Sequence, residues 1–224
     1  MILVFDNVLA TDELAKITSA LHEDDFEDGK ATAGWHARLV KNNTQLKTSD
    51  EERVANARHT INMAIERHGE FVRAFRPKLI RPALISRYTD GMSYGSHVDD
   101  PFMVGKPPIR TDLAMTLFLV EPDTYDGGEL VANSTYGRRT FELPAGSMVT
   151  YPATTLHEVM PVTRGVRLCA VTWGQSLVRD PALREMIYDL DNARREMFDR
   201  DGKTRSFDLV SKTHANLLRM WAEL

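Results

Sequence analysis

Three stretches of the chain place a histidine two residues before an acidic residue, a spacing that can hold a metal ion. They are His22-Glu23-Asp24, His68-Gly69-Glu70 and His97-Val98-Asp99. With 7 histidines and 32 acidic residues, about one such match is expected by chance, so the surrounding elements must decide. The first two triplets follow predicted helices and have no rigid strand to orient the pair, so we expect neither to bind a metal.

The third triplet comes nine residues after Tyr88, through a turn that contains glycine, and is predicted to open a strand. Residues i and i+2 of a strand face the same side, so His97 and Asp99 can converge on one ion. Asp100 would face the other way, and we expect it to cap the turn into Pro101. Strand parity therefore selects Asp99 as the ligand.

A third ligand is needed, because two side chains hold an ion weakly. The histidines outside the triplets are His36, His59, His157 and His214. His59 lies on the polar side of a predicted helix and His214 lies within the predicted terminal helix, so both are expected at the surface, whereas His36 stays open. His157 leads a predicted strand at the mouth of a barrel, where ligand sites are built. We predict that it completes the site.

Two histidines and one carboxylate on one face are the ligand set of non-heme Fe(II) oxygenases, which leaves coordination positions open for a co-substrate and O2. A structural zinc site with four protein ligands would leave no such room. Arg167 lies ten residues after His157 and, at period two, shares an apolar face with Cys169, Val171 and Trp173. A buried guanidinium needs an anionic partner. Its planar fork fits the far carboxylate of a 2-oxo acid that chelates the metal.

The N-terminal part of the chain, residues 1–78, is predicted to be a helical region that packs on the core. Helices are expected over 11–22 and 49–68, and the second begins with a capping-box pattern at Ser49-Asp50-Glu51-Glu52. Further expectations are an acidic solvated loop at 23–29, a strand at 35–41 and a solvated basic edge at 71–81.

The core, residues 79–176, changes to short strands separated by turns, the pattern of an antiparallel sandwich or barrel. The predicted strands span 79–88, 113–120, 129–133, 138–143, 147–151, 158–162 and 167–173. The extension at 177–224 returns to helices. The first is capped by Asp180-Pro181, ends at Gly202 and carries an apolar stripe, and the second spans about 206–223. The stripe residues are Met186, Leu190, Ala193 and Met197.

Composition sets the broad class. The chain has 224 residues, 42% of them hydrophobic, with 28 Lys and Arg against 32 Asp and Glu. It can bury one main core, and its mildly acidic balance argues against nucleic acid as a partner. Cys169 is the only cysteine, the apolar start is interrupted at Asp6 without preceding basic residues, and no apolar run reaches membrane-spanning length. These features favour a reducing cytoplasm, with no membrane partner.

Taken in order, the motifs resemble those of Fe(II)/2-oxoglutarate dioxygenases of the prolyl-hydroxylase-like group, and more narrowly the bacterial PKHD-type, PiuC-like hydroxylases. The matching residues are Arg87-Tyr88, Tyr94, His97-Val98-Asp99, Asp126-Gly127-Gly128-Glu129-Leu130, His157-Glu158-Val159-Met160-Pro161-Val162, Arg167 and Trp173. The resemblance implies a double-stranded β-helix, or jelly-roll, with flanking helices. It also implies Fe(II) on His97, Asp99 and His157, and 2-oxoglutarate on Arg167 and Tyr88.

The same resemblance implies oxidative decarboxylation of 2-oxoglutarate to succinate and CO2, coupled to hydroxylation of a second substrate. Ascorbate as reductant and a link to iron homeostasis are implied only in this way. Tyr94 and Trp173 are similar candidates for the pocket wall. The substrate stays open between a peptide and a small molecule.

Two rival functions and two structural questions stay open. A zinc hydrolase could use the same ligands with Glu158 or Glu129 as base, and a non-catalytic jelly-roll could sense iron or a metabolite. Residues 100–112 are either a lid or substrate loop beside the metal or a plain surface connection. The C-terminal helices either cover the barrel or pair two subunits in a homodimer.

Overall fold

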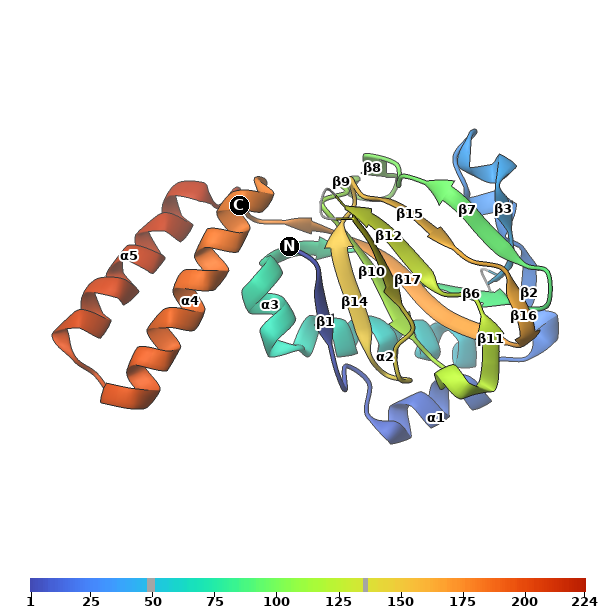
Figure 1. The fold of residues 1–224 in the computed structure, drawn as a ribbon, viewed down its shortest axis with the longest axis horizontal. Coiled ribbons are helices and arrows are strands. Elements are labelled where there is room, and N and C mark those ends of the chain that lie inside the picture. The colour runs from blue at the N-terminus through green and yellow to red at the C-terminus, as the bar shows by residue number, and fades with distance from the viewer. Residues whose placement is uncertain (48–50, 135–136) are drawn as a thin grey trace.

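The computed structural model describes residues 1–47, 51–134 and 137–224. Ser49 and Asp50 of the expected capping box lie outside these residues. Two antiparallel sheets pack face to face, and helices cover the outer face of the larger sheet (Figure 1). The chain is therefore mainly β with flanking helices, as its sequence pattern predicts.

Within the described residues, the larger sheet has eight strands and the smaller has five. In spatial order, the larger sheet consists of β1 (Leu3–Phe5), β14 (Met148–Pro152), β10 (Leu113–Phe118), β17 (Arg167–Ser176), β6 (Leu84–Tyr88), β4 (Thr44–Leu46) and β2 (Phe26–Asp28), with β5 (Pro77–Ile80) also paired to β17. The smaller sheet consists of β13 (Gly137–Phe141), β12 (Leu130–Ser134), β15 (Leu156–Val159), β7 (Ser93–His97) and β3 (Lys41–Asn42). Two short ribbons pair β11 (Tyr125–Gly127) with β16 (Val162–Gly165), and β8 (Phe102–Met103) with β9 (Ile109–Arg110).

The helices are α1 (Thr11–Ser19), α2 (Glu52–Arg67), α3 (Gly69–Phe75), α4 (Pro181–Asp201) and α5 (Arg205–Trp221), with short 3-10 turns at Glu23–Asp25, Gly29–Thr32, Ala37–Leu39 and Pro122–Thr124. The apolar stripe predicted for α2 is confirmed. Its buried residues are Val54, Ala57, Ile61, Ala64 and Ile65. No helix of the described residues is both long and apolar enough to cross a bilayer.

Strand β10 shows why the larger sheet is stable. All six of its residues are buried, because one face packs on the helices and the other on the smaller sheet. Leu113, Met115 and Leu117 belong to the core shared with α2 and α3. Ala114 and Phe118 belong to the core between the sheets. The space between the sheets is therefore partly lined by the alternate residues of the central strands.

Two N-terminal predictions of secondary structure are wrong. The acidic stretch 23–29 is largely exposed, as predicted, but it forms a 3-10 turn followed by β2, and arginines of other elements pair with two of its acids: Arg53 with Asp25 and Arg87 with Glu23. Residues 35–41 do not form a strand, since only Lys41 belongs to β3. The side chains of Trp35 and Leu39 are 81% and 79% exposed, so this apolar run faces solvent instead of a core.

The basic segment 71–81 is not a solvated edge either. It forms the end of α3 and strand β5, and its arginines bind other parts of the protein. Arg73 donates to the Asp191 carboxylate at 3.1 Å, and Arg81 donates to the carbonyls of Val104 and Pro107. The charges therefore fix the C-terminal helices and the β8–β9 ribbon in place.

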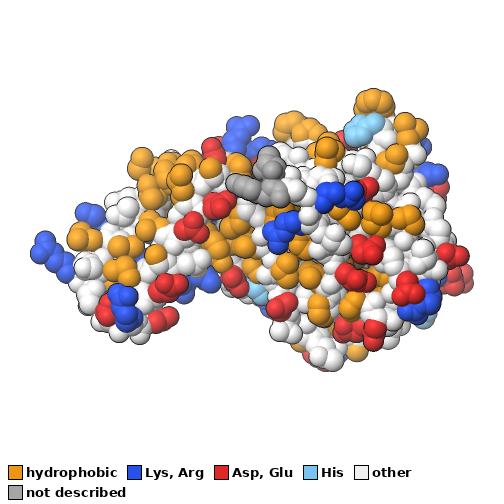
Figure 2. Space-filling view, viewed as in Figure 1, with side chains coloured by type: hydrophobic (Ala, Val, Ile, Leu, Met, Phe, Trp, Pro, Cys, Tyr) orange, Lys and Arg blue, Asp and Glu red, His pale blue; other side chains and the backbone are white. Residues whose placement is uncertain are grey.

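Helices α4 and α5 form a hairpin that contacts α3 and projects away from the sandwich, so it does not cover the barrel (Figure 1). Asp180 caps α4 and Gly202 ends it, as predicted. The predicted stripe is wrong, because the buried residues of α4 are Arg184, Ile187, Tyr188 and Asp191. Hydrophobic side chains, including Met186, Leu209 and Met220, instead lie exposed among charged ones (Figure 2).

A buried polar cluster explains this change of face. The Asp191 side chain is 0% exposed and accepts hydrogen bonds from Arg73, Arg194 and Arg195, and His214 of α5 lies 3.8 Å away. His214 is therefore buried, and its predicted surface position is wrong. Burial raises the pKa of Asp191, but the hydrogen bonds from the arginines outweigh it and hold the pKa at about 2.

We expect Asp191→Ala to lower the free energy of unfolding by about 3 kcal/mol, because it leaves several cations without their shared anion. The folded-state pKa of Asp191 is depressed, so its contribution is complete above about pH 4 and is lost as the pH falls towards 2. Urea unfolding at pH 7 and pH 3 measures both effects. Asp189→Ala, at an exposed site of the same helix, is the matched control. Equal midpoints for the two variants at pH 7 would contradict this assignment.

Candidate metal centre and co-substrate pocket

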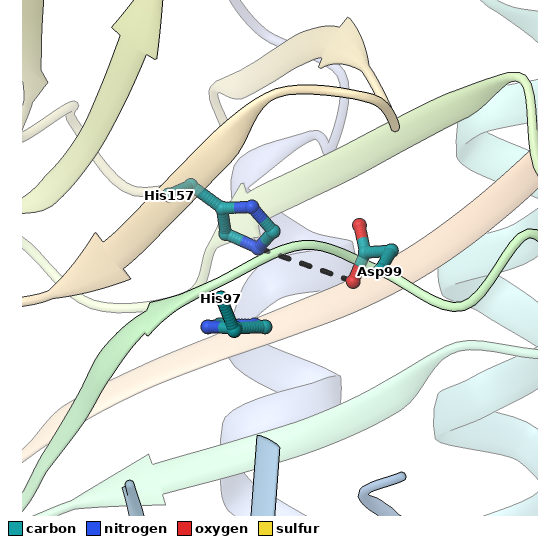
Figure 3. Close-up of side chains that lie close together, drawn as sticks. All are labelled: His97, Asp99 and His157. Carbon is teal, nitrogen blue, oxygen red and sulfur yellow. Dashed lines mark ion pairs between the residues drawn. The ribbon is translucent and has the colours of Figure 1, made fainter. Parts of the chain in front are cut away.

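His97, Asp99 and His157 meet between the two sheets. One ligand atom from each lies within 4.8 Å of those from the other two, and these three form the only such group of His, Cys, Asp and Glu among the described residues. His97 and His157 are direct cross-strand partners on β7 and β15. The His157 Nε2 atom lies 3.9 Å from the Asp99 Oδ1 atom (Figure 3). The predicted ligand set is thus brought together.

The histidines are oriented for metal binding. Each ring places Nδ1 against the backbone carbonyl two residues earlier, His97 on Gly95 at 2.8 Å and His157 on Thr155 at 3.0 Å. A carbonyl can only accept, so Nδ1–H donates and Nε2 keeps its lone pair for a metal. The Oδ2 atom of Asp99 is buried and has no hydrogen-bond partner within the part of the chain that the structure describes. This donor set, with an orphaned carboxylate oxygen, fits a divalent first-row metal such as Fe(II).

Burial controls the charge of these groups. Desolvation, followed by the neighbouring His157, lowers the pKa of His97 to about 3, so its imidazole is neutral at physiological pH. Burial raises the pKa of Asp99, while His157 and a hydrogen bond from the Trp173 side chain oppose that rise. A buried carboxylate beside the neutral imidazole of His97 lacks a full counter-charge. A bound cation would provide it.

Asp99 lies nearer the histidines than Asp100 does, but the prediction that their triplet opens a strand is wrong. The triplet does not open a strand, because β7 ends at His97 and Asp99 lies in the irregular segment that follows. The side-chain alternation nevertheless continues past the strand end. Val98 is exposed, the Asp99 side chain is 7% exposed, and Asp100 is exposed. Asp99 therefore faces the histidines, and Asp100 does not join the group.

A cavity of about 150 Å³ adjoins the triad and reaches Arg167. Arg167 is 1% exposed. Its NH1 donates to the Cys169 sulfur at 3.0 Å, but Nε and NH2 have no hydrogen-bond partner among the described residues. The Gly128 backbone, with φ of +72°, passes so close that a Cβ there would lie 2.7 Å from the Arg167 Cδ atom. Gly128 thus makes room for the buried Arg167 side chain, and its free N–H groups can bind an anion.

Three aromatic residues predicted for the pocket all line the cavity. Tyr88 pairs with Arg167 across β6 and β17, and the guanidinium carbon lies 5.2 Å from its ring centroid. Burial raises the pKa of Tyr88, so its hydroxyl stays protonated. Tyr94 stacks on His97 with ring centroids 3.6 Å apart. Trp173 reaches Asp99 from the larger sheet.

The segment 100–112 is not a structureless loop, because β8 and β9 pair within it and Arg81 holds its turn. Met103 and Asp100 border the cavity. His36 is half-buried but does not join the ligand group. The proposed bases of a zinc hydrolase are also elsewhere, since neither Glu129 nor Glu158 lines the cavity and Glu158 pairs with Arg138 at 2.8 Å.

The sequence pattern missed Lys41, Asn43 and Gln45. They are buried, line the cavity and lie where the chain crosses from β3 in the smaller sheet to β4 in the larger one. Alternation along 41–45 could have placed them on one face. The wrong strand predicted at 35–41 concealed that signal.

The fold and this site are those of a known superfamily. Residues 83–175 match the 2OG-Fe(II) oxygenase superfamily. Two solved structures share the fold. A Pseudomonas putida prolyl-4-hydroxylase has a TM-score of 0.55 and 17% identity, covering 78% of this chain and 92% of that one. A Trichoplax adhaerens prolyl hydroxylase, solved with a hypoxia inducible factor peptide fragment, has a TM-score of 0.60 and 13% identity, covering 83% and 86%. The expected double-stranded β-helix is confirmed.

Relatives that match the chain over its full length identify its family within this superfamily. A PKHD-type hydroxylase from a Synechococcus strain is 52% identical over 226 residues, covering 100% of both chains. Another from Crocosphaera subtropica is 47% identical over 224 residues, again with 100% of both chains covered. This chain belongs to the PKHD-type hydroxylases, which are Fe(II)- and 2-oxoglutarate-dependent oxygenases.

Proposed function

We propose that this protein hydroxylates a C–H bond of a second substrate while converting 2-oxoglutarate to succinate and CO2, with Fe(II) on His97, Asp99 and His157. The distal carboxylate of 2-oxoglutarate binds Arg167 and the hydroxyl of Tyr88. The observation that carries this proposal is the pair of free N–H groups on a fully buried arginine in the cavity that adjoins the triad.

The protein's own residues have separate tasks in this reaction. Bound Fe(II) would supply the activation of O2. Arg167 and Tyr88 hold the oxo acid in one orientation through charge-assisted hydrogen bonds. Buried apolar residues, including Leu130 and Val159, line the same cavity and exclude water from it. Tyr94 and Trp173 hold His97 and Asp99 in place.

The rival functions have less support. A zinc hydrolase needs a base next to the metal-bound water, and neither of its candidate bases, Glu129 and Glu158, is among the described residues that line the cavity. It also leaves the free N–H groups of Arg167 without a purpose. A metabolite sensor would keep every group described above, so only turnover distinguishes it from a hydroxylase.

We expect the Fe(II)-loaded protein to release succinate and CO2 from 2-oxoglutarate even without added substrate, at a slow rate, and the Zn(II)-loaded protein to release none. Succinate is measured by mass spectrometry and CO2 by isotope release from labelled 2-oxoglutarate. Zinc-dependent ester or amide hydrolysis would support the hydrolase. Binding of both ligands without turnover would support the sensor.

Four further parts of the proposal rest on the family resemblance or on chain layout. Ascorbate keeps the iron reduced, and the substrate belongs to iron uptake. Residues 79–176 carry the metal ligands and Arg167, residues 1–78 add strands to both sheets and part of the cavity wall, and residues 177–224 form a helical extension. The exposed hydrophobic side chains of the α4–α5 hairpin support its pairing in a homodimer.

A further inference from the structure

Lys41 is a buried cation, and neither metal binding nor 2-oxoglutarate binding, as proposed above, requires its charge. Its residue is 4% exposed and lines the cavity. Its ammonium donates one hydrogen bond, to the Thr32 hydroxyl at 3.0 Å, and lies 5.1 Å from the centroid of the Tyr94 ring. It forms no ion pair with any carboxylate that the structure describes. Burying an ammonium in this way is costly unless an anion joins it.

A chain of hydrogen bonds fixes the position of this ammonium. Lys41 donates to Thr32, the Thr32 hydroxyl donates to the Gln45 side-chain oxygen, and the Gln45 amide donates to the Ser86 hydroxyl at 3.0 Å. Among the described residues, the Thr32 hydroxyl is the one hydrogen-bond acceptor of the Lys41 ammonium. An ammonium has three N–H groups, and two of them stay available to a ligand.

Lys41 and Arg167 approach the metal ligands from different sheets. Arg167 begins β17 in the larger sheet, whereas Lys41 is in β3, beside β7 in the smaller sheet. Tyr94, the cross-strand partner of Lys41, contacts both the ammonium and the His97 ring. Lys41 also interacts electrostatically with His97 and Asp99. The ammonium therefore lies one aromatic ring away from the His97 imidazole.

The buried charges of the cavity do not balance without another anion. Lys41 and Arg167 are positive and Asp99 is the only buried carboxylate among the described residues that line it. Fe(II) and 2-oxoglutarate carry equal and opposite formal charges, so binding both leaves one positive charge in excess. Burial lowers the pKa of Lys41 to about 8, with Asp28 and Asp99 opposing the shift, so the amine is still mainly protonated at pH 7.

We propose that Lys41 binds a free carboxylate of the substrate and thereby positions the neighbouring C–H bond at the metal, so that the enzyme acts on an anionic carboxylic acid. Since Lys41 then acts on the substrate of the hydroxylase, the assignment rests on the proposed function. Small acids and the C-terminus of a peptide both present this group. The side-chain amide of Asn43, which is buried and lines the same cavity beside Tyr88, is a second donor for it.

The test compares acids with their own amides. The probes are N-acetyl amino acids, and N-acetyl tripeptides for the peptide case, each as the free acid and as the primary amide. They are titrated into the Zn(II)-loaded protein with saturating 2-oxoglutarate, which binds without turnover. The readouts are the dissociation constant and the NMR shift of the isotope-labelled Lys41 ammonium. We expect at least one acid to bind about tenfold or more tightly than its amide, because a charge-assisted hydrogen bond is lost in the amide.

Variants show whether the preference comes from Lys41. In Lys41→Met, the acid should bind no better than its amide, within about twofold, whereas Lys41→Arg should keep most of the preference because the charge remains. Thr32→Val removes the supporting hydrogen bond but keeps the charge. Lys47→Met, at an exposed site after β4, should behave as the parent. Thermal unfolding of each variant separates a folding defect from a binding defect.

Two outcomes would overturn the assignment: no acid preferred over its amide in the parent protein, or an unchanged preference in Lys41→Met. Repeating the acid and amide titrations without metal and 2-oxoglutarate separates this proposal from the proposed function. An intact acid preference in a protein that never releases succinate would disprove the hydroxylase and keep the lysine site. Succinate release without any acid preference would support the hydroxylase and disprove the assignment of Lys41.

Discussion

Metal affinity is expected to fall by at least about a hundredfold in Asp99→Ala and to stay unchanged in Asp100→Ala. Groups that merely support metal ligands cost 10 to 100-fold in affinity when removed, so the loss of a ligand itself should cost at least as much. The two residues are adjacent and chemically identical. They differ because the Asp99 oxygens face the two imidazoles, whereas Asp100 is exposed.

Competition against a chromogenic chelator measures this difference for Fe(II) under anaerobic conditions, and Co(II) absorption reports the ligand set. His59→Ala, at an exposed histidine of α2, controls for adventitious binding by surface imidazoles. Similar losses in the two aspartate variants would show that Asp99 is not a ligand. An unchanged Fe(II) affinity in Asp99→Ala would also show that Asp99 is not a metal ligand.

The second large effect is expected at Arg167. Arg167→Met should weaken 2-oxoglutarate binding by about a thousandfold, since two hydrogen bonds to a charged group contribute roughly 1.5–3 kcal/mol each. Metal affinity should not change. The folded state should tolerate the change, because an apolar side chain of similar length can replace a buried charge with little loss of stability. Arg167→Lys should recover only part of the affinity, as it lacks the planar fork.

Calorimetric titration of 2-oxoglutarate into the Zn(II)-loaded protein gives these dissociation constants. The matched control is Arg164→Met, three residues earlier, where an exposed arginine pairs with Asp126 at 2.6 Å. If Arg167→Met bound metal and retained the parent affinity for 2-oxoglutarate, the distal carboxylate would have another partner. Lys41 would then be the first residue to examine.

Local periodicity was sufficient to predict the centre of the site. Period two along β17 placed Arg167 on one face with Cys169 and Trp173, and all three line the cavity. The same parity favoured Asp99, although the triplet follows the end of β7 at His97 and does not open a strand. Side-chain alternation continues past the strand end, which brings the Asp99 carboxylate beside the histidines.

The errors arose where distant residues override local pattern. The buried face of α4 is built around Asp191, whose arginine partners include Arg73, more than a hundred residues earlier. Apolar spacing cannot reveal a buried ionic cluster, so the stripe was placed on the wrong side. Lys41 was missed for a related reason. Its burial depends on pairing with β7, and the exposed apolar run before it resembles a strand.

The chain crosses from one sheet to the other at Asn43, in a part of the sequence separate from the metal ligands. The metal ligands and Arg167 all lie within residues 83–175, the part shared with the superfamily. Strand β3 is the edge strand of the smaller sheet and β4 pairs with β6 in the larger sheet, and both lie outside that part. Because the proposed substrate contact of Lys41 lies here, substitutions in β3 and β4 are expected to change which substrate binds and to leave the metal ligands and Arg167 in place.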